Sequence, residues 1–190
     1  GINFNVENLA YDANGNILSM RQWGLKGTSS TIIDDLVYTY FDKSNKLKNV
    51  IDGVIDPNTK LGDFRASTRY LTFDGNKDIN SIDYDYDQNG NLIQDLNKDM
   101  EIVYGPDFST VPILYNHLNL PFSIEISNDQ GNGSKKGNIY YLYDATGSKL
   151  EKRVRENPAT SNNNTEKNTT TTYIGGFVYE NDKLQFFGHE

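Results

Sequence analysis

The residues most suggestive of chemistry form an acidic segment near the middle of the chain. Asp85, Asp87 and Asn89 stand at alternate positions and are followed by Gly90, which matches the first half of a calcium-binding loop. The twelfth position of such a loop supplies a bidentate glutamate, and here it is Leu96. The same residues have the composition of a hairpin turn. A structural turn therefore explains this segment better, and calcium is the weaker alternative.

Side chains that could carry catalysis are few. The only two histidines are His117 and His189, and the absence of cysteine excludes disulfides, thiolate zinc sites and a cysteine nucleophile. Glu101, Glu125 and Glu151 fall in predicted strands and are the best candidates for a pair of catalytic carboxylates, although solvated strand positions explain them equally well. No glycine-rich phosphate loop leads into a helix. We predict no enzymatic activity and no cofactor.

The charge of the chain restricts its partners. A net charge of -8 and a pI near 4.8 argue against a nucleic-acid-binding surface, which would have to neutralise phosphates. The one basic cluster runs from Lys149 to Arg155, and its alternation with Leu150 and Val154 favours a solvated strand face. No apolar run is long enough for a membrane helix, and the N-terminus of this chain does not resemble a signal peptide. We predict no nucleic-acid partner and no membrane insertion.

A repeated motif organises the sequence. Each copy has an aromatic residue, then Asp or Asn, a short polar stretch with Gly or Asn, and an aliphatic residue or proline. The aromatic anchors at positions 11, 41, 86, 115, 143 and 173 are separated by 30, 45, 29, 28 and 30 residues. The copies are Tyr11–Ile17, Phe41–Leu47, Tyr86–Leu92, Tyr115–Pro121 and Tyr143–Leu150.

Each copy has the composition of a hairpin turn. The Asp side chain accepts backbone hydrogen bonds, and the Gly or Asn takes a positive φ, which together make a type I turn closed by a left-handed residue. We assign structural roles in these anchors and turns to Tyr11, Asp12, Gly15, Asp42, Tyr86, Asp87, Gly90, Tyr115, Asn119, Tyr143, Asp144 and Gly147, and to Gly175 and Gly176 at the end of the series.

Alternating side chains between the turns predict antiparallel strands. Leu36, Tyr38 and Tyr40 share one face, and the set Ile82, Tyr84 and Tyr86 shares another, with Asp83 and Asp85 opposite. The chain has 24 Asn and 18 Asp but only five Ala, a balance that disfavours helices. The expected fold is all-β, a strip of antiparallel hairpins without helices.

The expected organisation is one β domain in three stretches. Residues 1–155 form the hairpin array, 156–172 form a flexible low-complexity loop, and 173–190 begin a further set of strands. Within the array we expect an extra short strand at Arg69–Phe73 and a glycine-rich hairpin tip at Ser127–Asn138.

The repeat motif resembles the YD repeat of the bacterial Rhs family. The best matches are Tyr11–Ile17, Tyr86–Leu92 and Tyr143–Leu150, and Tyr115–Pro121 resembles the variant found shortly before the core region of that family. The stretch from Tyr173 to Glu190 is similar to the opening of the core region. The resemblance extends from about Leu9 to the end of the chain.

The resemblance implies a fold and a role. YD repeats of this family stack as β-hairpins into a strip that winds into a hollow shell, which can enclose a toxic C-terminal domain. By this analogy the chain is an open piece of a shell in a secreted or cell-surface bacterial protein of polymorphic toxin type. Its partners would be the rest of its parent chain or an enclosed effector. A closed shell needs more repeats, and the self-cleaving aspartate of the family would lie beyond Glu190.

Two further expectations concern binding. An excised strip should self-associate through exposed strand edges. The alternative function is a carbohydrate-binding or adhesive surface module, in which Trp23, the aromatic residue least explained by repeat packing, forms a platform for glycans. The fixed place of the tyrosines before the turns favours a structural role for them instead.

Overall fold

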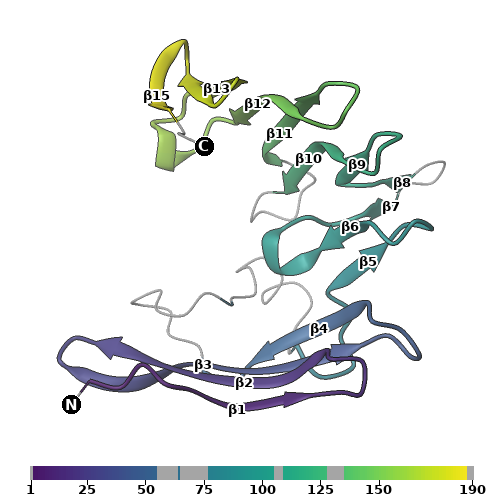
Figure 1. Cartoon of the computed structure of the whole chain (residues 1–190), viewed down its shortest axis with the longest axis vertical. Helices are drawn as coiled ribbons and strands as arrows, with labels where there is room; N and C mark the ends of the chain where they lie inside the picture. Colours follow the sequence, from purple (N-terminus) through teal and green to yellow (C-terminus); the bar gives the residue numbers. More distant parts are fainter. Residues whose placement is uncertain (1, 55–63, 65–76, 105–108, 128–134, 188–190) are drawn as a thin grey trace. The chain divides into compact units, whose positions relative to one another are not determined.

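The computed structural model describes residues 2–54, 64, 77–104, 109–127 and 135–187 (Figure 1). The chain divides into two compact units, Gly1–Asp85 and Tyr86–Glu190. Residue 155, where the expected hairpin array ends, lies in the second unit. The strand expected at Arg69–Phe73 lies outside the described residues.

The first unit is built on a four-stranded antiparallel sheet in the order β1-β2-β3-β4. Its strands are β1 (Val6–Tyr11), β2 (Ile17–Lys26), β3 (Ser29–Tyr40) and β4 (Leu47–Asp52). Each strand pairs with its neighbour in sequence, so the sheet is a meander of hairpins, drawn in purple and blue in Figure 1. Strand β5 (Tyr84–Tyr86) follows and spans the boundary between the units.

The second unit is built on a seven-stranded antiparallel sheet in the order β15-β14-β13-β12-β11-β10-β9. Its strands are β9 (Ile113–Tyr115), β10 (Pro121–Ser127), β11 (Lys135–Tyr143), β12 (Lys149–Glu156), β13 (Lys167–Ile174), β14 (Phe177–Glu180) and β15 (Lys183–Phe187). Strand β6 (Leu92–Asp95) pairs with β5, and β7 (Val103–Tyr104) pairs with β8 (Ser109–Thr110).

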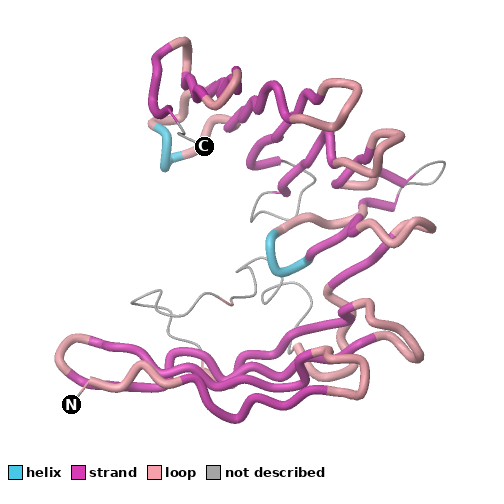
Figure 2. Tube along the Cα trace, in the orientation of Figure 1, coloured by secondary structure: helices cyan, strands magenta, loops and turns pink. Residues whose placement is uncertain are grey.

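Among the described residues the only helical elements are two short 3-10 turns, η1 (Leu96–Lys98) and η2 (Thr160–Asn162), coloured cyan in Figure 2. The prediction of an all-β fold of antiparallel hairpins is confirmed.

The two predicted loops of the second unit are shorter than expected. The low-complexity stretch 156–172 was expected to be a loop, but β13 begins at Lys167 and pairs with β12 from Glu156 back to Glu151. Threonine is β-branched and packs well in a sheet, which outweighs the low complexity of this stretch. Likewise, β10 extends to Ser127 and β11 begins at Lys135, inside the predicted tip at 127–138.

The apolar core is thin. The buried hydrophobic side chains of the described residues are Leu36, Val50, Tyr84, Ile102 and Ile113. The alternation predicted for β3 is confirmed at Leu36 and Val37, which are 4% and 44% exposed, whereas Tyr38, Thr39 and Tyr40 are all half-buried.

The alternation predicted around Asp83 is wrong. Ile82 is 51% exposed, whereas Asp83 is fully buried. Strand β5 begins only at Tyr84, so residues 82 and 83 do not follow its period, and Asp83 has polar partners that are described below.

Candidate functional site: contacts between neighbouring hairpin turns

The repeat turns have the geometry expected from their sequence. In the first turn the Asp12 amide donates to the Asn16 carbonyl over 2.9 Å, and the Gly15 amide donates to the Asp12 carbonyl over 3.1 Å. Oδ1 of Asp12 accepts the backbone N–H groups of Asn14 and Asn16, both at 2.8 Å. The same pattern recurs in the turns that begin at Asp87, Asn116 and Asp144.

The fourth residue of each of these turns adopts a positive φ. The angle is 86° at Gly15 and Gly90, 90° at Gly147 and 58° at Asn119. Glycine adopts this conformation without steric cost and asparagine tolerates it, which explains the residue types at this position.

The aspartates that begin these turns are held in the ionised form. The side-chain amide of Asn16 donates to the Asp12 carboxylate and lowers the pKa of Asp12, with further lowering from backbone amides of the turn. Asn91 lowers the pKa of Asp87 in the same way. In the last turn the Thr146 hydroxyl is the main cause of the lowered pKa of Asp144.

The turn at Asp42 is built differently. It is one residue longer, since the Phe41 amide donates to the Lys46 carbonyl and the Ser44 amide donates to the Phe41 carbonyl. The residue with positive φ is Lys43, at 53°. The hydrogen bonds of this loop therefore start at Phe41 rather than at Asp42, which corrects the role predicted for Asp42.

A tyrosine hydroxyl joins each of three hairpins to the one before it. Tyr40 donates to the carbonyl of Ile17 at 2.9 Å. The other two bonds join Tyr115 to the Leu92 carbonyl at 2.7 Å and Tyr143 to the Pro121 carbonyl at 2.9 Å. Each acceptor is the fifth residue after the Asp or Asn of its turn, so the contact is equivalent in all three cases. Burial raises the pKa of the three tyrosines, which keeps the hydroxyls protonated as donors.

Asparagine side chains make a second contact between neighbouring turns. In the first unit the side-chain amides of Asn14 and Asn16 both donate to Oδ1 of Asn45, at 3.0 and 2.8 Å. In the second unit Asn89 and Asn91 both donate to Oδ1 of Asn119, at 3.0 Å each. One amide oxygen of the later turn thus bridges two asparagines of the earlier turn.

The next pair of turns replaces this polar contact by an apolar one. Leu118 and Leu120 occupy the positions held by the two donating asparagines in the other turns. Their side chains lie against Gly147, where an added Cβ would be 3.2 Å from Leu120 and 3.9 Å from Leu118. Glycine at position 147 therefore provides both the left-handed conformation and the space for Leu120.

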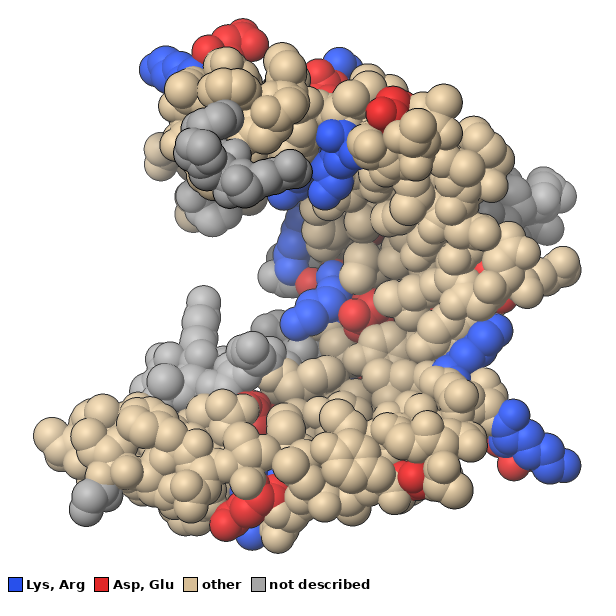
Figure 3. Space-filling model, viewed as in Figure 1, with Lys and Arg blue, Asp and Glu red and all other residues tan. Residues whose placement is uncertain are grey.

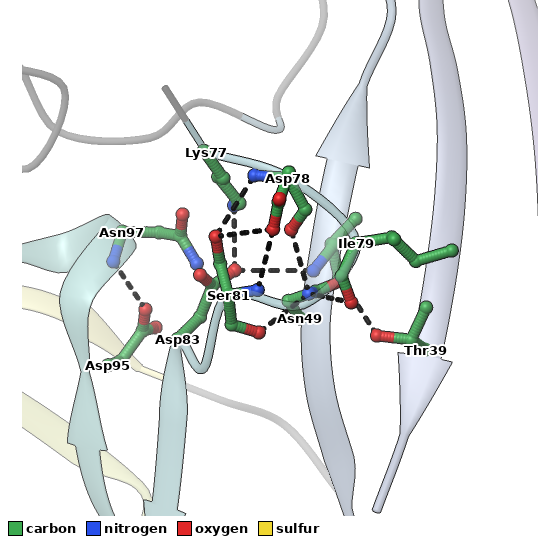
Figure 4. A network of polar contacts seen from close by, with 10 residues as sticks. Thr39, Asn49, Lys77, Asp78, Ile79, Ser81, Asp83, Asp95 and Asn97 are labelled. Atoms are coloured by element: carbon green, nitrogen blue, oxygen red, sulfur yellow. Dashed lines mark hydrogen bonds and ion pairs between the residues drawn. The ribbon is translucent and has the colours of Figure 1, made fainter. Parts of the chain in front are cut away.

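A buried polar network holds the segment 77–83 against β4 (Figure 4). The side chain of Asn49, fully buried, donates to the carbonyls of Asp78, Ile79 and Ser81 at 3.2, 3.1 and 2.7 Å. Its Oδ1 accepts the hydroxyl of Thr39 at 2.7 Å. Asn49 thus joins β4 to the 77–83 segment through three of its backbone carbonyls.

Asp83 is the charged centre of this network. Its carboxylate pairs with the ammonium group of Lys77 at 2.6 Å, with side-chain exposures of 0% for Asp83 and 8% for Lys77. The same carboxylate accepts the Val50 amide at 3.3 Å, and the Asp83 amide donates to the Lys48 carbonyl at 2.9 Å. Since β4 ends its sheet, these bonds occupy backbone groups of an edge strand that could otherwise pair with another chain.

Sequence reasoning did not identify Asn49, Lys77 or the role of Asp83. The only sign of a buried Asp83 was indirect. Asp83 directly precedes Tyr84 and lies two residues before Asp85, and the alternation of this segment predicts a solvated aspartate at position 83. The partners of Asn49 lie 10 to 32 residues away, and no local pattern indicates them.

Trp23 has a structural role in the first sheet. Its indole N–H donates to a carboxylate oxygen of Glu7 at 2.8 Å, and its side chain is half-buried. Its backbone amide donates to the Asn5 carbonyl at 2.9 Å. These two hydrogen bonds join Trp23 to Glu7 of β1 and to Asn5, which directly precedes β1.

The oxygens that a calcium ion would need are partly engaged in the turn. Both carboxylate oxygens of Asp87 accept hydrogen bonds from the turn, and the Asn89 side chain donates to Asn119. Asp85 lies in β5 and has interactions of its own. Within the described ranges no group of three His, Cys, Asp or Glu residues is arranged to hold a metal ion.

The residues considered for catalysis are dispersed. Glu125 pairs with Lys135, and Glu151 pairs with Arg153 at 2.5 Å, so both act in ion pairs on strands. Glu101 precedes β7 rather than lying in a strand, which corrects the prediction for it. His117 is exposed in a repeat turn, and His189 lies outside the described residues.

No family model matches the chain, and no curated protein matches it either. In the described part of the chain no helix is long and apolar enough to cross a membrane.

Proposed function

We propose that this chain is a non-enzymatic structural module, a segment of β-wall in a large bacterial Rhs-like protein of the polymorphic toxin type. The wall would enclose or present a C-terminal effector. The observation that carries the proposal is the hydrogen bond from a tyrosine hydroxyl to a backbone carbonyl of the preceding hairpin, made by Tyr40, Tyr115 and Tyr143.

This hydrogen bond suits a wall because each further hairpin can make the same bond to the hairpin before it. Its acceptor is a backbone carbonyl, so the contact does not depend on the side chain at that position, which is Ile17, Leu92 or Pro121. The side-chain contacts beside it do vary, from asparagine bridges to the packing of Leu120 on Gly147. A stack held mainly by backbone-directed contacts tolerates sequence change while keeping its geometry, as repeat proteins do.

Two parts of this proposal, the enclosed effector and the location of the protein, are inferred from the resemblance of the motif to YD repeats. Secretion or display on the bacterial surface follows from that resemblance alone. The carbohydrate-binding alternative has less support, because Trp23 is half-buried and its N–H is engaged by Glu7.

The first test is to read the native gene across the codon for Glu190 to its stop. We expect a completed Rhs-type core region followed by an unrelated globular domain. A sorting or anchoring domain in that place, together with binding of this chain on a glycan panel, would overturn the wall proposal in favour of an adhesive module.

The second test uses the full-length native protein and limited proteolysis. If these hairpins enclose the effector, the effector resists protease in the native protein. Tyr115→Phe combined with Tyr143→Phe should expose it, because both variants remove a contact between hairpins. Tyr140→Phe is the matched control, since this tyrosine is 45% exposed and belongs to the same sheet. Rapid cleavage of the effector in the native protein would contradict enclosure.

A further inference from the structure

Strand β12 carries basic side chains on both faces, and they differ in their partners. Basic atoms gather over β11 and β12 in the space-filling view (Figure 3). On one face, Arg153 pairs with Glu151 at 2.5 Å and Arg155 pairs with Glu166 at 2.6 Å. These two charges are neutralised within the protein.

On the other face, Lys149 and Lys152 have no acidic partner among the residues that the structure describes. This is notable in a chain with a net charge of -8, which has more carboxylates than cations to pair with them. Two uncompensated positive charges on one strand form a local site of positive potential.

Three tyrosines surround these lysines. Lys152 is directly opposite Tyr141, and Lys149 is directly opposite Tyr143, so all four side chains share one face of the sheet. The ammonium group of Lys149 lies 4.9 Å from the ring centre of Tyr141 and 5.5 Å from that of Tyr173. We call these five residues the lysine–tyrosine patch.

The patch offers both cations and hydroxyl donors. Burial raises the pKa of Tyr141 and Tyr143, so their hydroxyls stay protonated at neutral pH. The Tyr143 hydroxyl already donates to Pro121, whereas that of Tyr141 makes no hydrogen bond with a described residue. Cation–π contacts position Lys149 without neutralising its charge.

We propose that the lysine–tyrosine patch binds an acidic segment of a polypeptide partner. Carboxylates of the partner would pair with Lys149 and Lys152, and the free tyrosine hydroxyl would donate to one of them. The half-buried Ile139 and Val154 lie on the same face and would contact apolar side chains of the partner. The acidic side chain of Glu180, opposite Thr171, marks the end of the patch.

Other anions fit less well. A sugar acid would need an open tyrosine ring to stack on, but Lys149 lies over the rings of Tyr141 and Tyr173. Nucleic acid would need a longer row of uncompensated cations than this patch supplies, in a strongly acidic chain.

The test is calorimetric titration of this chain with a synthetic decapeptide of alternating Glu and Leu, at low salt. We expect binding that weakens as salt is added, because exposed charges are screened. The double variant Lys149→Gln, Lys152→Gln should weaken binding by about tenfold or more, as expected for the loss of two charge pairs. Circular dichroism checks that the variant keeps its strands.

The matched control removes two positive charges from the opposite face of the same strand. Arg153→Gln with Arg155→Gln has the same net charge as the lysine variant, and we expect it to bind the peptide nearly as well as the native chain. Equal losses in both variants, or no binding by the native chain, would overturn the proposal. Tighter binding of polygalacturonate or of duplex DNA than of the peptide would also overturn it, in favour of a glycan or a nucleic acid.

Discussion

The hydroxyl of Tyr115 donates a hydrogen bond to the backbone carbonyl of Leu92, 2.7 Å away and 23 residues earlier in the chain. Tyr40 and Ile17 are related by the same separation, and Tyr143 and Pro121 by 22 residues. A tyrosine that precedes one turn therefore donates a hydrogen bond to the backbone carbonyl that follows the previous turn. These hydrogen bonds hold the hairpins formed by successive copies of the sequence repeat against one another.

Removing one of these hydroxyls should weaken the stack. We expect Tyr115→Phe to lower the free energy of unfolding by about 1 kcal/mol, the usual net value of one hydrogen bond, because the Leu92 carbonyl loses its donor. Urea unfolding measures the change. Tyr140→Phe, at an exposed position, should change stability by less than about 0.5 kcal/mol. Equal effects of the two variants would contradict a specific role for the Tyr115 hydroxyl.

The left-handed residue of the turn should accept few replacements. Gly90 has a φ of 86°, so Gly90→Val should cost more than about 1 kcal/mol, because a β-branched side chain is strained there. Gly90→Asn should cost less, since Asn119 occupies the equivalent position of another turn. Thermal unfolding of the two variants provides the comparison. A valine variant as stable as the asparagine variant would show that the turn relaxes.

Breaking the buried ion pair should be among the most damaging single changes. Lys77→Met leaves the Asp83 carboxylate buried without its cation, and losses of about 3–5 kcal/mol are typical of such changes. The control is Arg21→Ala, which breaks a pair with Asp35 whose side chains are about one-third exposed. We expect a loss below about 1 kcal/mol there. Chemical denaturation that ranks the two variants in the opposite order would contradict the structural role of Lys77.

Acid should loosen the turns that begin with aspartate. The pKa values of Asp12, Asp87 and Asp144 are lowered from the ordinary 3.8, so their contribution to stability is present above that pH. It is lost as the pH falls through the lowered values, because the unfolded chain then binds protons that the folded chain does not. Stability measured from pH 6 down to pH 2 should therefore fall below about pH 4.

A neutral replacement tests whether the turn aspartates are responsible for the loss of stability in acid. Asp87→Asn keeps an acceptor for the turn amides, as Asn116 does in the equivalent place. The variant should show a shallower loss of stability in acid than the native chain. An unchanged acid profile would assign the effect to other carboxylates.

The all-β fold and the form of the turns could be predicted from the sequence because their causes are local. The Asp87 carboxylate binds amides only two and four residues away, and Gly90 adopts its positive φ without steric cost because it has no Cβ. The alternation of Leu36 and Val37 likewise reflects the two-residue period of a strand. Interactions of this range are encoded in a few consecutive residue types.

The contacts between hairpins were decided only by the tertiary structure. Asn119 bridges Asn89 and Asn91 from 28 to 30 residues away, and Asp83 accepts the Val50 amide across 33 residues. No local preference distinguishes Asp83 from a solvated aspartate, because its burial depends on Lys77 and on the edge of β4. The same holds for Lys149 and Lys152, because the strands beside β12 decide that no acidic side chain of the described residues pairs with them. Residue types thus determined the hairpins, and packing between distant segments determined which side chains became buried, paired or available for a partner.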